Sequence, residues 1–236
     1  MPRALIAVAY QHGEHEGLGL LEPALREAGF ALDLRPIGEV WPQDARADLV
    51  VAMGGPMGAY EASRFPFLLG ELGILRARVA SRRPVLGVCL GAQLLAAAAG
   101  ARVFPGAQGK EIGVEPVSLT DAGREDPAFS ILPPAFFAAH WHGDTWDEVP
   151  GAVLLAATRY PQAFRLGPSY GLQFHPELSR EAFSAWLLHG AAQVATLGKS
   201  PARLSEELLR LEGAAPLTSG LLARLAQHFA RVASRR

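Results

Sequence analysis

Apolar and polar positions show two kinds of pattern in the first hundred residues, one typical of strands and one typical of helices. Apolar runs typical of strands buried on both faces occupy residues 4–9, 48–53 and 85–88, and residues 30–34 alternate like a strand. Helical spacing lies between these strands and predicts helices over residues 18–28, 67–80 and 92–99, of which the first and last are followed by glycine. Because strands and helices alternate, the chain predicts an α/β fold with a doubly wound, mostly parallel sheet flanked by helices.

The second half of the chain has a different pattern. Turn residues separate shorter apolar stretches, which predict an added antiparallel strand region at residues 114–119, 136–141, 153–157, 163–166 and 171–174. A helix is predicted at residues 180–189, and an amphipathic pair at 205–211 and 221–232, with linkers at 198–201 and 213–216. We therefore expect one domain over residues 1–197 and a C-terminal helical extension, 198–236, packed on it. The alternative use of the apolar faces of this extension is a homodimer.

Composition narrows the class of protein. Half of the 236 residues are hydrophobic and the formal net charge is −1, so we expect neither a nucleic-acid partner nor an anionic membrane partner. The single cysteine cannot form an internal disulfide, which is typical of a reducing compartment. The apolar stretch near the N-terminus is too short to span a membrane and lacks a signal-peptide pattern. These features predict a soluble, cytoplasmic protein.

The single cysteine, Cys89, lies in Gly87-Val88-Cys89-Leu90-Gly91, between a predicted strand and a predicted helix. Small neighbours allow a sharp turn that exposes the sulfur, and a helix N-terminus favours the thiolate. Far downstream, His175 and Glu177 are two residues apart, so in an extended segment they share a face. The alternative to a catalytic role is that Cys89 is a buried, unreactive residue that only packs in the core. The sequence nevertheless favours a nucleophile with a base and an orienting carboxylate.

Three segments resemble class I (triad-type) glutamine amidotransferases. Residues 87–93, Gly-Val-Cys-Leu-Gly-Ala-Gln, are similar to the family's nucleophile segment, Gly-x-Cys-x-Gly-x-Gln. Residues 171–177, Gly-Leu-Gln-Phe-His-Pro-Glu, are similar to its Gly-x-Gln-Phe-His-Pro-Glu segment, and Gly54-Gly55-Pro56 resembles its glycine loop. The three matches occur in the family's order and cover roughly residues 4–190. The resemblance implies a flavodoxin-like fold and similarity to the glutaminase domain of GMP synthases.

The resemblance also implies roles for individual residues. Cys89 would attack the carboxamide carbon of glutamine, His175 would move the proton, and Glu177 would hold the imidazole. The oxyanion would be stabilised by the backbone N–H of Leu90 and by that of Gly55, since the proline after Gly55 has no N–H.

Further residues are expected at the substrate. Gln93, one helical turn after the nucleophile, resembles the family glutamine that contacts substrate. Residues 140–144, His-Trp-His-Gly-Asp, resemble a Ser-His-Gly-Asp segment near bound glutamine in GMP synthases, which implies contacts from His142 and Asp144, although Trp141 departs from that pattern. A structural hydrogen-bonding role for His142 and Asp144 stays open as an alternative to substrate contact. Metal ligation is least favoured because no further cysteine or close carboxylate cluster completes a coordination shell, so neither a metal nor a cofactor is expected.

The first loop carries His12, Glu14, His15 and Glu16. We expect a solvated charged loop, with a pocket-lining role kept open by its position at the carboxyl end of a strand.

The leading hypothesis is a glutamine amidotransferase that releases glutamate and ammonia for an unidentified acceptor. No synthase module follows the predicted domain, so we expect the acceptor domain either to be a separate chain, such as a synthase subunit, or to be absent. A γ-glutamyl amide or peptide hydrolase would use the same triad, and a catalytically idle binding module would keep only the fold.

Overall fold

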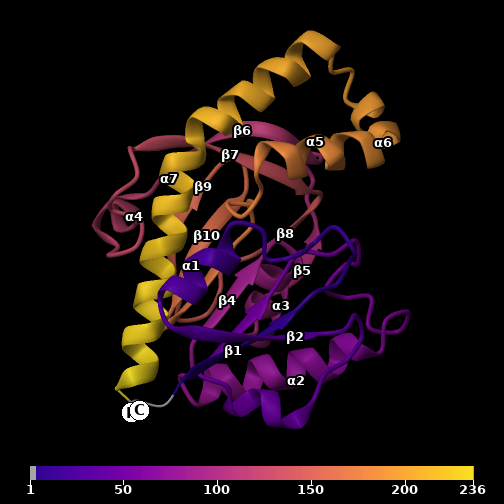
Figure 1. The fold of residues 1–236 in the computed structure, drawn as a ribbon. Helices are drawn as coiled ribbons and strands as arrows, with labels where there is room; N and C mark the ends of the chain where they lie inside the picture. The colour runs from indigo at the N-terminus through magenta and orange to yellow at the C-terminus, as the bar shows by residue number, and fades with distance from the viewer. Residues whose placement is uncertain (1–3, 236) are drawn as a thin grey trace.

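The computed structural model describes residues 4–235, and a nine-stranded mixed sheet forms the centre of this part of the chain (Figure 1). The strand order is β2-β1-β3-β4-β11-β10-β9-β6-β7. The first five strands in this order are mutually parallel and the remaining pairs are antiparallel. The strands are β1 (Leu5–Tyr10), β2 (Phe30–Arg35), β3 (Leu49–Ala52), β4 (Val85–Val88), β6 (Glu111–Leu119), β7 (Ala135–His142), β9 (Val153–Ala157), β10 (Pro161–Leu166) and β11 (Ser169–Leu172). The predicted fold class, with its added antiparallel region, is confirmed.

Helices cover both faces of the sheet (Figure 1). Apolar residues of α2 and α3 share one buried cluster, whereas those of α1 and α7 belong to another with the opposite side of the sheet. The helices are α1 (Leu21–Glu27), α2 (Phe67–Ala80), α3 (Leu90–Ala98), α4 (Asp121–Glu125), α5 (Arg180–His189), α6 (Ala191–Thr196) and α7 (Pro201–Ser234). A 3₁₀ helix (Pro42–Arg46) and a two-stranded sheet of β5 (Val103–Pro105) and β8 (Asp144–Trp146) complete the described elements. None of the helices in residues 4–235 is long and apolar enough to cross a membrane.

The C-terminal region differs from the prediction of two helices joined by a linker at residues 213–216. It is one continuous helix, α7, which contains Pro216 and bends visibly along its length (Figure 1). Proline removes one helical hydrogen bond and favours a kink. Leu211 before the expected linker and Leu221 after it are both buried, so packing on the core outweighs the local preference for a break.

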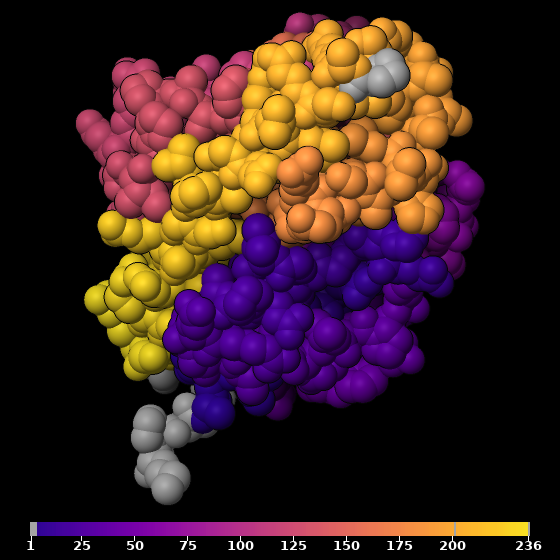
Figure 2. All heavy atoms as spheres, turned by 45° about the horizontal axis from the view of Figure 1, so that its top comes forward, coloured from indigo at the N-terminus to yellow at the C-terminus, as the bar shows by residue number. Residues whose placement is uncertain are grey.

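The C-terminal segments also contact the N-terminal half. Figure 2 shows the orange α5–α6 region lying directly against the indigo N-terminal residues. The indole N–H of Trp186 donates to the carbonyl of His15 at 3.1 Å, and the rings of His15 and His189 lie 4.4 Å apart. The loop after β1 is therefore held by α5.

Three loops meet at the carboxyl ends of β3, β4 and β11, because β4 pairs in parallel with both neighbours. The N–H of Cys89, directly after β4, donates to the carbonyl of Leu172 in β11 at 2.7 Å. The N–H of Gly91 donates to the carbonyl of Met53, directly after β3, at 3.1 Å. The cysteine turn is thus tied to both adjacent strands, which places it at the centre of this edge.

Candidate active site

The turn at Cys89 has the strained backbone that the flanking glycines suggest. Cys89 has φ 51° and ψ −109°, and α3 begins at the next residue, Leu90. A Cβ at Gly87 would collide with the backbone of Gly91, and a Cβ at Gly91 would collide with the carbonyl of Ala52. Both obstacles are backbone atoms, so only glycine fits at these positions. The close packing holds the sulfur at the end of β4.

The side chains of His175 and Glu177 lie next to each other after β11, as their spacing predicts. His175 Nδ1 is 2.7 Å from Glu177 Oε1, and both residues are buried. The N–H of His175 donates to the carbonyl of Ala139 in β7 at 2.9 Å, and the ring of Trp186 packs edge-on against the imidazole at 4.8 Å. Backbone and ring contacts therefore fix the imidazole, and its Nε2 makes no hydrogen bond within 3.5 Å to another nitrogen or oxygen of the described residues.

Cys89 is close enough to His175 to affect its charge. Burial alone would lower the pKa of His175, but the interactions of the imidazole with Glu177 and with Cys89 outweigh burial and raise this pKa well above its ordinary value. The Cys89 sulfur also lies 3.9 Å from the carbonyl of Trp141, to which its thiol can donate. The structure thus brings sulfur, imidazole and carboxylate together, and the raised pKa of His175 favours an imidazolium in this arrangement.

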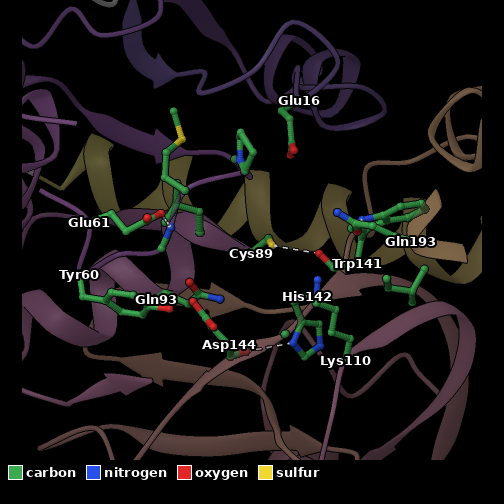
Figure 3. Close-up of a pocket in the computed structure, with 17 residues that line it drawn as sticks. Glu16, Tyr60, Glu61, Cys89, Gln93, Lys110, Trp141, His142, Asp144 and Gln193 are labelled. Carbon is green, nitrogen blue, oxygen red and sulfur yellow. Dashed lines mark hydrogen bonds between the residues drawn. The ribbon is translucent and has the colours of Figure 1, made fainter. Parts of the chain in front are cut away.

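A cavity of about 370 Å³ opens in front of the cysteine (Figure 3). The sequence-predicted residues Gly55, Leu90, Gln93, His142 and Asp144 all line it together with Cys89. His175 and Glu177 are not among the residues that line it. A small molecule in this cavity would meet the sulfur first.

The three predicted substrate-contact residues differ in how free their side chains are. The Gln93 amide donates to Gln173 Oε1 at 3.1 Å. The ring of His142 is engaged at both nitrogens, since Nδ1 lies 3.1 Å from the Asp144 carbonyl oxygen and Nε2 lies 2.9 Å from Glu111 Oε2. The Asp144 carboxylate borders the cavity beside Tyr60 (Figure 3), whose pKa is raised by burial and by this carboxylate. Asp144 is therefore better placed than the His142 ring nitrogens to bind a charged ligand.

The expectation of a solvated first loop is wrong for two of its four charged residues. Glu14 and His15 are exposed, whereas His12 is buried and Glu16 lines the cavity. Burial and the nearby charge of Glu177 raise the pKa of Glu16, although neighbouring histidines act in the opposite direction. The sequence did offer one signal for this position of Glu16. The loop follows β1, and loops at the carboxyl ends of parallel strands lie at the edge of the sheet where ligands bind.

The sequence showed no further residue that could complete a coordination shell with the histidines of residues 140–144, but the fold brings one carboxylate to them. Glu111 of β6 pairs with His142 across the sheet, and the ligand atoms of Glu111, His140 and His142 lie within 4.8 Å of one another. This trio is a candidate metal-ligand set. Glu111 already accepts hydrogen bonds from Gln162 and Thr158, at 2.7 Å each, so its oxygens are occupied. Burial and the neighbouring histidine lower the pKa of His140 to about 3, which keeps that ring neutral.

The fold and this site define a class of protein, and comparison with known families agrees. A family model described as glutamine amidotransferase class-I matches residues 19–191. The chain belongs to the class I glutamine amidotransferase family.

Relatives and solved structures support this membership. The chain is 30% identical to the glutamine amidotransferase-like protein YfeJ of Salmonella typhimurium over 78% of its own length and 80% of that protein's length. It is also 30% identical to a glutamine-hydrolysing GMP synthase subunit from Ignicoccus hospitalis, over 67% of this chain and 82% of that one. A crystal structure of a glutamine amidotransferase from Thermotoga maritima superposes with a TM-score of 0.83 at 30% identity, covering 97% of this chain and 99% of that chain.

Proposed function

We propose that this protein hydrolyses the side-chain amide of glutamine through a cysteinyl thioester and releases glutamate and ammonia for an acceptor on a separate chain. One observation carries the proposal. His175 has Glu177 on its Nδ1 and interacts with the only sulfhydryl of the chain, that of Cys89, which borders a cavity. This is the arrangement that nucleophilic acyl transfer requires.

Cys89 attacks the γ-carbonyl carbon after its proton has passed to His175, and the carbonyl oxygen becomes an oxyanion. Leu90 is the first residue of α3, where a backbone N–H lacks a partner within the helix, and Gly55 borders the same cavity. Each such donor contributes a factor of about 10² to 10³ in rate. His175 then returns the proton to the departing ammonia, and a water molecule hydrolyses the thioester with the same groups.

The cavity supplies groups for the amino-acid end of the substrate. The Asp144 carboxylate suits an α-ammonium group, and Gln93 offers amide atoms at the cavity wall. Because both ring nitrogens of His142 are already engaged, we propose that His142 contacts substrate through its ring edge and positions Asp144 through the Nδ1 hydrogen bond to the Asp144 backbone.

The acceptor of the ammonia would lie on another chain. The relative from Ignicoccus hospitalis is one subunit of a GMP synthase. By analogy we propose that the partner is a separate synthase subunit.

A direct assay tests this function. Purified protein should convert glutamine to glutamate and ammonia, and Cys89→Ala should abolish turnover, because no other sulfhydryl can form the thioester. Glu14→Gln, in the exposed part of the first loop, is the matched control and should retain activity. Faster turnover of γ-glutamyl amides or peptides than of glutamine would replace the proposed substrate. Absence of any turnover, together with no covalent adduct from a glutamine-analogue chloroketone, would leave a binding module.

A further inference from the structure

A buried histidine–glutamate pair contacts the backbone of the glycine loop, Gly54-Gly55-Pro56. His12, in the loop after β1, and Glu71, in α2, are 3% and 1% exposed. His12 Nε2 is 2.8 Å from Glu71 Oε2, while Nδ1 lies 3.1 Å from the carbonyl oxygens of both Met53 and Gly54. None of the catalytic steps above uses this pair.

The partners of His12 determine where its protons are. Carbonyl oxygens only accept hydrogen bonds, so Nδ1 must carry a proton. The other nitrogen shares a proton with the Glu71 carboxyl, and whichever group holds that proton, Nδ1 remains a donor to the glycine loop. The charge of Glu71 raises the pKa of His12 against the opposing effect of burial, which favours the imidazolium.

Anchoring one carbonyl sets the direction of the next N–H. In a trans peptide the C=O and the following N–H point in opposite directions, and the described chain contains no cis peptide. Because the Gly54 carbonyl points to His12, the Gly55 N–H points away from it. A Cβ on Gly55 would lie 2.6 Å from His12 Cβ and 2.8 Å from Leu90 Cδ2, so Gly55 lies between His12 and the residue after the nucleophile.

We propose that His12, held by Glu71, is a positioning residue that locks the Gly54–Gly55 peptide with the Gly55 N–H directed into the cavity, as an oxyanion donor. This inference rests on the proposed function, and it adds a residue outside the triad to the same reaction. A donor that is fixed before the reaction costs no reorganisation when the oxyanion forms.

Two substitutions of similar shape test the two ring nitrogens of His12 separately. His12→Asn places an amide nitrogen near the position of Nδ1 and retains the donor to the loop. His12→Gln places it near Nε2, which retains the bond to Glu71 and removes the anchor of the Gly54 carbonyl. We expect kcat for glutamine to fall about 10- to 100-fold in His12→Gln with KM within about threefold of wild type, whereas His12→Asn should keep kcat within about threefold.

A purely structural role would affect both variants alike. Thermal unfolding of each is therefore compared with that of His228→Asn, in which another histidine loses the hydrogen bond of its Nε2 to a backbone carbonyl, that of Pro168. Alkylation of Cys89 by iodoacetamide forms no oxyanion, so its rate should be unchanged in His12→Gln. Equal kcat values in the two His12 variants, or a parallel fall in alkylation rate, would overturn the inference.

A spectroscopic measurement is independent of activity. Nitrogen-15 NMR of the wild type should show a proton on His12 Nδ1 from about pH 5 to about pH 9. A deprotonated Nδ1 in this range sinks the inference even if glutamine is hydrolysed. A protonated Nδ1 in a protein that does not hydrolyse glutamine overturns the proposed function and with it the catalytic role of the anchor, while the anchor itself stands.

Discussion

At the scale of single residues, the charge of His175 is the property on which the proposed chemistry depends. Its imidazole is completely enclosed, and enclosure by itself disfavours the protonated form. Glu177 is the main cause that reverses this preference, through its charge and a contact of 2.7 Å, and Cys89 acts in the same direction. Glu177 therefore acts on reactivity and on folding at the same time, because a pKa that changes on folding makes stability depend on pH.

We expect Glu177→Gln to lower kcat by about 10² to 10⁴, because the imidazole loses the group that stabilises its protonated form. Folding raises the pKa of His175 above its unfolded value near 6.5, so the associated stabilisation is complete below about pH 6.5 and is lost as pH rises through the folded pKa. The difference in free energy of unfolding between wild type and Glu177→Gln should therefore be largest below about pH 6.5. Denaturant unfolding at several pH values measures it, with Glu14→Gln as the control. A difference that does not vary with pH would contradict the expectation.

The residues that the sequence predicted for the reaction come from short local motifs, which can be read without a structure. His175 and Glu177 are adjacent because two residues in an extended segment share a face. His12 and Glu71, or Glu111 and His142, are far apart along the chain and meet only through sheet pairing and helix packing. Such pairs could not be predicted from one sequence.

At the scale of elements, the apolar runs of the parallel half predicted its strands, because strands buried on both faces are apolar at every position. The short elements β5, β8 and α6 were missed because three to six residues show too little periodicity. The error at α7 has another cause. Gly213 and Pro216 are local signals for a break, and contacts made with distant strands override them.

Substitutions along α7 should reveal which part of this helix is structural. Phe229 is completely buried in the cluster shared with the sheet, whereas Leu209 is 61% exposed. We expect Phe229→Ala to reduce the free energy of unfolding by about 3–5 kcal/mol, and Leu209→Ala to change it by less than about 0.5 kcal/mol. Urea titration followed by circular dichroism measures both. Equal effects would show that the C-terminal half of α7 is not part of the cooperative core.

At the scale of the whole molecule, the apolar face of the C-terminal half of α7 is already covered. Leu221, Leu225 and Phe229 are buried against α1 and the sheet of the same chain. The proposed helical extension therefore offers little apolar area for a second copy, because detaching it would expose the core.

We accordingly expect a monomer at micromolar concentration in sedimentation-velocity experiments. A dimer would have to use a different surface, and Leu188 on α5, which is 78% exposed, is the most exposed large apolar side chain described. If a dimer is found, Leu188→Glu tests whether α5 forms its interface. Concentration-dependent association that persists in this variant would exclude α5.

The junction between β4 and β11 has a consequence for how this protein would lose activity. The sulfur follows β4 and the imidazole follows β11, so the N-terminal and C-terminal portions each supply one half of the reacting pair. Slippage of β4 against β11 would separate the two groups even while other contacts between the portions, such as that of Trp186 with His15, remain. The rate of turnover would then report how well the two portions are packed together. On heating or addition of denaturant, this rate would fall before spectroscopy detects unfolding.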